Sequence, residues 1–144
     1  MMNENTLDAA SNSRVILYLE DDDPTAYMFD RVLRDLNSAV LIYHVADCAS
    51  ARAFLSRTPP FVDVPRPHVV VLDINVSGDS GLSVLRAMRS DPELAQIPVI
   101  IFTASTAASD RKEASENLAD GYLVKTAELA AFTSAAELVL RLAA

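Results

Sequence analysis

Several side chains that can bind a cation or a phosphate stand directly after short apolar runs of this sequence. They are Glu20 and Asp21 after the first run, Asp73 after the third, Thr103 after the fourth and Lys125 after the fifth. Carboxylates that lie close together repel one another unless a cation sits among them, and Mg²⁺ prefers such oxygen ligands. A hydroxyl and an ammonium suit the oxygens of a phosphoryl group. If the fold brings this set together, it predicts magnesium-assisted phosphoryl transfer with Asp73 as the nucleophile.

Asp73 also has a simpler interpretation when it is taken alone. A carboxylate after a strand often caps the next helix or begins an Asx-turn. Because the ends of three other strands carry four side chains that can bind a cation or a phosphate, the sequence favours a reactive Asp73 over a cap.

The elements that must position these groups alternate between strand and helix. Apolar runs predict strands over residues 14–19, 40–45, 69–72, 98–102 and 121–124. Helical spacing and capping residues predict helices over about 24–36, 47–57, 82–91, 110–118 and from about 128 to the end. Five such βα repeats predict an α/β fold, a doubly wound five-stranded parallel sheet. The carboxyl ends of its strands meet at one edge, where we expect the polar set to converge.

Length, charge and composition restrict the class of protein. The 144 residues suit a polar N-terminal extension over 1–13 and one domain over 14–144. The net charge of −8 disfavours binding to nucleic acid or anionic lipid. No apolar run approaches the roughly 20 residues of a membrane span, and the first residues lack the apolar region of a secretory signal. With one cysteine, Cys48, there is no internal disulfide, and we expect a cytoplasmic protein.

Four motifs stand in a fixed order between Val15 and the end of the chain: LEDDDP, VVVLDINVSGDSGLSVLRAMR, IPVIIFTAS and GYLVK. As a set, they resemble the receiver domain of bacterial two-component response regulators, which has a flavodoxin-like, CheY-like fold. The resemblance implies that Asp73 accepts a phosphoryl group from a sensor histidine kinase. It also implies that Mg²⁺ is the cofactor and is bound by Glu20, Asp21, Asp73 and the backbone carbonyl of Asn75.

The resemblance assigns roles to the other strand ends as well. Thr103 would bind a phosphoryl oxygen and report its arrival, and Lys125 would form an ion pair with the phosphoryl group. The backbone at Asn75 and Ala104 would contact the same group. Tyr122 matches the rotating aromatic residue of the family's switch, although a half-buried strand residue explains it equally well.

The sequence departs from the family pattern at three places. Four acids precede Pro24 where two are usual, so the metal-binding pair is Glu20/Asp21 or Asp21/Asp22; we prefer the first, because Leu19 closes the strand. The usual cis Lys-Pro is replaced by Lys125-Thr126, whose peptide bond is either strained cis or trans. Ser77 replaces a proline in the turn after Asp73, which should leave that turn less stiff.

Two features predict partners. The insertion that ends in Pro65-Arg66-Pro67 resembles small single-domain regulators that pair with phytochrome-type kinases. In the last helix, Leu129, Phe132, Ala136, Val139 and Leu140 form one apolar face, which we expect in the core. A second apolar stripe predicts a homodimer around a two-fold axis. It consists of Ala131, Ala135, Leu138 and Leu142.

Two other functions compete with a phosphoacceptor domain. A pseudo-receiver would be a non-phosphorylated interaction module, but such chains typically lose the acids or the lysine that are present here. A phosphatase with an Asp nucleophile would need a second Asp two residues later, and Asn75 cannot transfer that proton. We therefore expect a signalling domain that catalyses only its own phosphorylation and dephosphorylation, and no other enzymatic activity.

Overall fold

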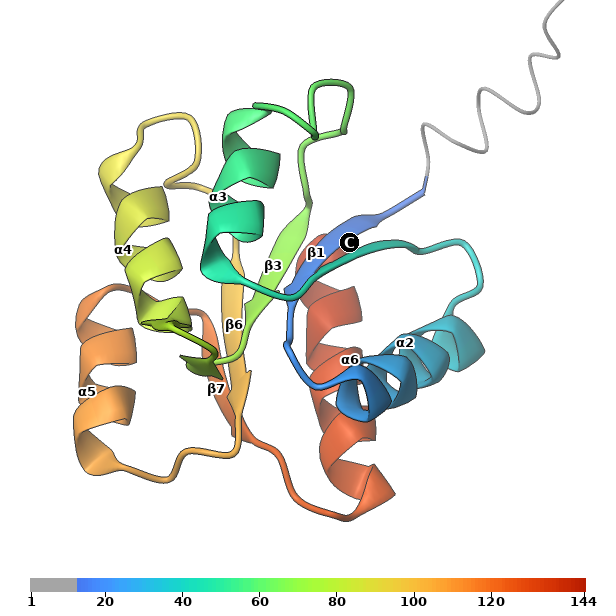
Figure 1. Cartoon of the computed structure of the whole chain (residues 1–144). Coiled ribbons are helices and arrows are strands. Elements are labelled where there is room, and N and C mark those ends of the chain that lie inside the picture. Colours follow the sequence, from blue (N-terminus) through green and yellow to red (C-terminus); the bar gives the residue numbers. More distant parts are fainter. Residues whose placement is uncertain (1–12) are drawn as a thin grey trace, which may run out of the picture.

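The computed structural model describes residues 13–144, in which helices cover both faces of one sheet (Figure 1). The elements follow in the order β1 (Val15–Leu19), α2 (Asp23–Leu36), β2 (Leu41–Val45), α3 (Cys48–Ser56), β3 (Val69–Leu72), β4 (Asn75–Val76), β5 (Asp79–Ser80), α4 (Gly81–Ser90), β6 (Val99–Thr103), α5 (Ala108–Glu116), β7 (Gly121–Val124) and α6 (Leu129–Ala143). The N-terminal extension predicted over 1–13 lies outside the described residues, apart from residue 13.

The main sheet has five parallel strands in the order β2-β1-β3-β6-β7. Helices α2 and α6 pack on one face, and α3, α4 and α5 pack on the other (Figure 1). This arrangement confirms the predicted doubly wound α/β fold. It also brings the carboxyl ends of all five strands to one edge of the sheet.

The central strand, β3, is buried along its whole length. Val70 and Leu72 pack into the core beneath α3 and α4, whereas Val69 and Val71 pack into the core beneath α2 and α6. A strand between two helical layers has no polar face, which explains its uninterrupted apolar sequence. Asp73 is the first residue beyond this strand, at the carboxyl edge of the sheet.

Side-chain caps fix the starts of the first two helices. The Asp22 carboxylate accepts a hydrogen bond from the Thr25 N–H at 3.0 Å, and Asp47 accepts one from the Ser50 N–H at 2.7 Å. These bonds satisfy backbone donors that have no partner within their own helix. Asp22 therefore belongs to α2, whereas Glu20 stands at the end of β1.

The segment after β3 is more ordered than the turn that the sequence predicts. Asn75 pairs with Ser80 and Val76 with Asp79, so that β4 and β5 form a small antiparallel hairpin. Gly78 closes it with a φ of +81°, a conformation that favours glycine. Strands of two residues are too short to show an alternating apolar pattern, so the sequence gives no signal for them.

The prediction for the last helix was wrong in part. Ala135 is fully buried, although it was assigned to the exposed stripe, and Leu129 is 59% exposed, although it was assigned to the core. The other members of the stripe, Ala131, Leu138 and Leu142, are half-buried against the protein's own core. The reason is that α6 packs against α2 as well as against the sheet, so its buried surface is broader than one stripe.

Among residues 13–144, the one cis peptide bond joins Pro59 and Pro60, so the bond between Lys125 and Thr126 is trans. No helix within residues 13–144 is both long enough and apolar enough to cross a bilayer.

Candidate functional site

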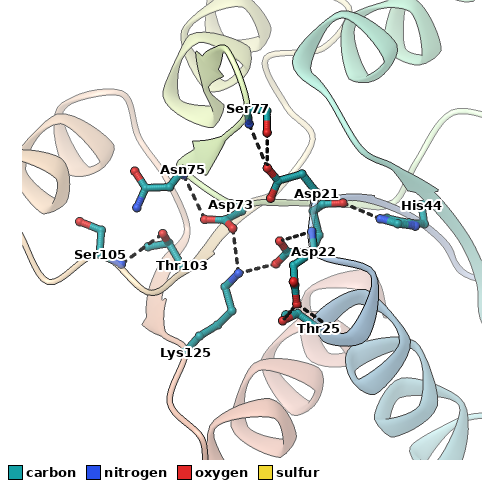
Figure 2. A network of polar contacts seen from close by, with 11 residues as sticks. Asp21, Asp22, Thr25, His44, Asp73, Asn75, Ser77, Thr103, Ser105 and Lys125 are labelled. Carbon is teal, nitrogen blue, oxygen red and sulfur yellow. Dashed lines mark hydrogen bonds and ion pairs between the residues drawn. The ribbon is translucent and has the colours of Figure 1, made fainter.

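Three carboxylates converge at the carboxyl edge of the sheet (Figure 2). One oxygen each of Glu20, Asp21 and Asp73 can be chosen so that all three lie within 4.8 Å of one another. Glu20 and Asp73 are buried, at 1% and 5% exposure, while Asp21 is partly open to solvent. The ends of β1 and β3 bring them together, because these strands are neighbours in the sheet.

Lys125 reaches this cluster from the end of β7. Its Nζ donates to Asp73 Oδ2 at 2.8 Å and also to the Glu20 carboxylate. Burial alone would lower the pKa of Lys125, but the hydrogen bonds and ion pairs with Asp73 and Glu20 outweigh it and raise the pKa. Burial has the opposite effect on Glu20, because it is an acid. It raises the pKa of Glu20, although the hydrogen bond and the charge of Lys125 act to lower it.

The four consecutive acids at residues 20–23 do not all have the same role. Asp22 accepts from the backbone and the hydroxyl of Thr25 and thereby caps α2. The carboxylates that approach Asp73 are those of Glu20 and Asp21. The structure therefore favours Glu20/Asp21 over Asp21/Asp22, the choice that the sequence left open.

The backbones and side chains beside the acids are held by specific bonds. His44 Nε2 lies 2.6 Å from the backbone oxygen of Glu20, and the Asn75 N–H donates to Asp73 Oδ1 at 3.1 Å. Ser77 donates to Asp21 Oδ2 from both its N–H and its hydroxyl, at 3.0 and 2.9 Å (Figure 2). In the sequence, Ser77 is notable only because it replaces a proline, and no sequence pattern predicts its contact with Asp21.

Gly81, the first residue of α4, lies against the backbone of Asp73. A Cβ atom at this position would come within 2.0 Å of the Asp73 carbonyl oxygen, so no side chain fits without displacing one of the two segments. The start of α4 and the residue at the end of β3 are therefore in direct contact.

Thr103 and Tyr122 lie on the other side of Asp73. Thr103 is fully buried, its hydroxyl accepts from the Ser105 N–H at 3.3 Å, and its carbonyl accepts from the Lys125 N–H at 2.7 Å. The half-buried Tyr122 donates its hydroxyl to the Ser105 carbonyl at 3.0 Å, and the Arg111 guanidinium lies 4.5 Å from the centre of its ring. Ser105, in the loop after β6, thus joins the two residues predicted to form a switch. Ala104, the residue after Thr103, is exposed.

The composition of the cluster fits a hard divalent cation. Three carboxylates face the single positive charge of Lys125, and two of these acids are buried. Carboxylate oxygens are the ligands that Mg²⁺ and Mn²⁺ prefer, and a cation would relieve their repulsion. The arrangement is suited to binding such an ion together with an anionic group near Thr103 and Lys125.

A family model identifies the class of protein. The model for the response regulator receiver domain matches residues 16–137. The chain belongs to this family. Receiver domains are components of two-component signalling, and the motifs from which the resemblance was inferred lie within or at the ends of the matched region.

Individual relatives support the same assignment. The response regulator Rcp1 of Synechocystis sp. is 29% identical over 122 residues, which cover 85% of this chain and 83% of Rcp1. The structure of the Mn²⁺-bound form of Rcp1 matches this receiver domain with a TM-score of 0.80 at 27% identity, over 88% of this chain and 91% of that chain. The bacteriophytochrome response regulator RtBRR matches with a TM-score of 0.75 at 31% identity, over 89% of this chain and 78% of that chain.

Other relatives are longer than this receiver domain. The nitrate/nitrite response regulator NarP of Escherichia coli is 37% identical over 109 residues, which cover 75% of this chain but 46% of NarP. The similarity to NarP therefore concerns only part of that protein.

Proposed function

We propose that this receiver domain accepts a phosphoryl group on Asp73 from a sensor histidine kinase, in a Mg²⁺-dependent reaction. The observation that carries the proposal is the cluster at the carboxyl edge, where Asp73 lies beside two acids and the Lys125 ammonium. This set combines a nucleophilic carboxylate, ligands for a cation and a positive charge for the product.

Each residue at this edge has a role in the proposal. Glu20, Asp21 and Asp73, with the backbone carbonyl of Asn75, would hold Mg²⁺, which neutralises negative charge when bound. Lys125 forms an ion pair with the phosphoryl group once it arrives. The Thr103 hydroxyl and the backbone N–H groups of Asn75 and Ala104 donate to its oxygens.

The transfer forms one bond and breaks another. A carboxylate oxygen of Asp73 attacks phosphorus while the bond from phosphorus to the kinase's histidine nitrogen breaks. The released imidazole keeps the electron pair of that bond and takes up a proton. Hydrolysis of the acyl phosphate returns Asp73 and phosphate, so the domain catalyses only its own phosphorylation and dephosphorylation.

We further propose that Thr103 and Tyr122 transmit the change. The Thr103 hydroxyl accepts from the Ser105 N–H, and Tyr122 donates to the Ser105 carbonyl. If the Thr103 hydroxyl turns to donate to a phosphoryl oxygen, Ser105 and Tyr122 would shift with it. Replacing Thr103→Ala should preserve phosphorylation and abolish its effect on partner binding. Full coupling in this variant would refute the switch.

The input is proposed to be a phytochrome-type kinase in the cytoplasm. The similarity to the bacteriophytochrome response regulator RtBRR and the insertion before β3 support this choice. Mixing the domain with phosphorylated kinases of this and other types, and comparing the rates of transfer, tests it directly.

Homodimerisation through α6 remains a prediction, but the surface available for it is smaller than the four residues of the predicted stripe. Ala135 is buried, so the contact would rest on Ala131, Leu138 and Leu142, which are only half-buried. The mass in solution at micromolar concentration, with and without a phosphate mimic, tests it; a monomer in both conditions contradicts it.

Intact mass after incubation with Mg²⁺ and acetyl phosphate tests the main proposal. The expected result is an adduct of about 80 Da that requires Mg²⁺ and is absent in Asp73→Asn. Asp22→Asn is the matched control, because it removes an equal charge from the acid that caps α2 and should keep the adduct. A wild-type protein without an adduct indicates a pseudo-receiver, and turnover of phosphomonoesters indicates a phosphatase.

A further inference from the structure

Ser77 joins the β4–β5 hairpin to the acids at the end of β1, 56 residues away in the sequence. Its N–H and its hydroxyl both donate to the same oxygen of Asp21, at 3.0 and 2.9 Å (Figure 2). A proline, the residue usual at this position according to the family resemblance, has neither donor. The departure from the family pattern therefore creates a contact that the usual residue cannot make.

The hairpin that carries Ser77 is itself anchored from the opposite side. Arg52 of α3 donates to the Asp79 carboxylate and to the Ser83 hydroxyl, each at 3.0 Å. The turn between β4 and β5 is thus held between α3 and Asp21. Because its position is restrained, Ser77 can orient Asp21 rather than simply follow it.

Asp21 needs such a restraint more than the other two acids of the cluster do. Glu20 and Asp73 are buried and bound to Lys125, whereas Asp21 is partly exposed. The terminal torsion of an aspartate is broad, so an exposed carboxylate samples many orientations. Two donors on Oδ2 restrict this rotation and leave Oδ1 available to a cation.

We propose that Ser77 is a positioning residue that holds Asp21 ready for Mg²⁺ and thereby sets the affinity of the site for the metal. The inference rests on the proposed function, in which Glu20, Asp21 and Asp73 hold the ion. Hydrogen-bond partners of ligating carboxylates commonly change metal affinity by about 10- to 100-fold when they are removed. Ser77 acts on the metal only through Asp21.

The test measures Mg²⁺ affinity in the full chain, by competition with Mn²⁺ followed through electron paramagnetic resonance. Ser77→Ala should weaken Mg²⁺ binding by about 10-fold. Ser77→Pro should weaken it at least as much, because both donors are lost, and Ser77→Thr should restore wild-type affinity. Urea unfolding without metal checks that each variant is folded.

The matched control is Thr25→Ala, which removes a hydroxyl-to-carboxylate bond from Asp22, the next acid in the chain. It should destabilise α2 and leave Mg²⁺ affinity unchanged. In an Asp21→Asn background, Ser77→Ala should have no further effect on the remaining affinity, because the two residues act through one contact.

The outcomes separate the two proposals. Unchanged or tighter Mg²⁺ binding in both Ser77→Ala and Ser77→Pro overturns the role of Ser77 while the metal site stands. A loss that persists undiminished in the Asp21→Asn background overturns it as well, because the effect would then not pass through Asp21. A wild-type protein that binds no Mg²⁺ overturns the proposed function together with this inference.

Discussion

Each edge of the sheet holds a largely covered cation beside carboxylates, but the charges balance differently at the two edges. At the amino edge, the Arg89 side chain is 11% exposed and lies beside Asp120, at 3.2 Å. Its terminal nitrogens also donate to three backbone carbonyls, those of Ala95, Ile97 and Leu118. Asp120 in turn accepts from the Val99 N–H at 2.8 Å. One cation thus meets one anion, and most polar atoms of the pair are satisfied.

At the carboxyl edge, the charges do not balance. Lys125 supplies one positive charge to Glu20, Asp21 and Asp73 together. A largely covered charge therefore does not by itself identify a functional site. A balanced cluster can be explained as structure, whereas an excess of negative charge is relieved by a bound cation or by protonation, as the raised pKa of Glu20 shows.

The largest expected effect is on stability at the amino edge. Arg89→Met keeps most of the apolar stem but removes the charge and the hydrogen bonds to three backbone carbonyls, which should lower the free energy of unfolding by about 3 kcal/mol. Urea unfolding measures this change. Mg²⁺ affinity should not change, and a parallel loss of affinity would show that the two edges are not independent.

Bound Mg²⁺ should offset the excess negative charge at the carboxyl edge. At a concentration 100 times its dissociation constant, Mg²⁺ should raise the free energy of unfolding by about 2.7 kcal/mol. Asp21→Asn should reduce this gain, while Asp22→Asn should retain it, because Asp22 caps α2 outside the cluster. Urea unfolding with and without Mg²⁺ provides the measurement, and an equal loss in both variants would contradict the division of roles.

Removing Lys125 should make the imbalance larger. Lys125→Met leaves Glu20 and Asp73 without their cation and should lower the free energy of unfolding by about 2 kcal/mol near neutral pH without metal. Burial and Asp73 raise the pKa of Glu20, so the folded state favours the protonated acid. The contribution of Glu20 to stability is then greatest below pH 4.5, the ordinary Glu value, and falls as pH rises through the raised pKa.

Thermal unfolding of the Lys125→Met protein across pH 4 to 8 checks both the size and the sign of this effect. Added Mg²⁺ should restore part of the lost stability, since it replaces the missing positive charge. The variant should lose more stability relative to the wild type as pH rises, and a difference that shrinks over this range would contradict the burial of Glu20 as the cause.

The smallest effect concerns Tyr18, just below the carboxyl edge. Its hydroxyl is buried and forms no hydrogen bond of normal geometry within residues 13–144, although the Glu20 carboxylate lies near it. Burial, followed by the charge of Glu20, raises the pKa of this phenol, so it stays neutral. Tyr18→Phe should increase the free energy of unfolding by about 1 kcal/mol, because an unsatisfied hydroxyl is removed from the core. Urea unfolding measures it; Tyr27→Phe, at an exposed tyrosine, is the control and should have little effect.

The sequence predicted those features that depend on local pattern. The apolar run over Val69–Leu72 identified the buried central strand, and the strand ends identified Asp73 and Lys125 as neighbours. Parallel strands enforce this convergence, so the order of the elements sufficed. The cap at Asp47 followed from residue type and position.

Features that depend on the approach of distant segments were missed. The pairing of Arg89 with Asp120 and that of Ser77 with Asp21 join residues 31 and 56 positions apart. Neither pair stands out by composition, because charged and hydroxyl residues are common on any surface. The error at Ala135 and Leu129 has a related cause, since helical periodicity gives the direction of a face but not the number of elements that pack on it.

The two glycines around the β4–β5 hairpin constrain how this sequence can vary. Gly78 has a positive φ and open space around it, so Asn, which tolerates this conformation, is an acceptable replacement. At Gly81 the obstacle is the carbonyl oxygen of Asp73, and every other residue carries the Cβ that would collide with it. In a library of functional variants, position 78 should therefore tolerate Asn, while position 81 should admit glycine alone.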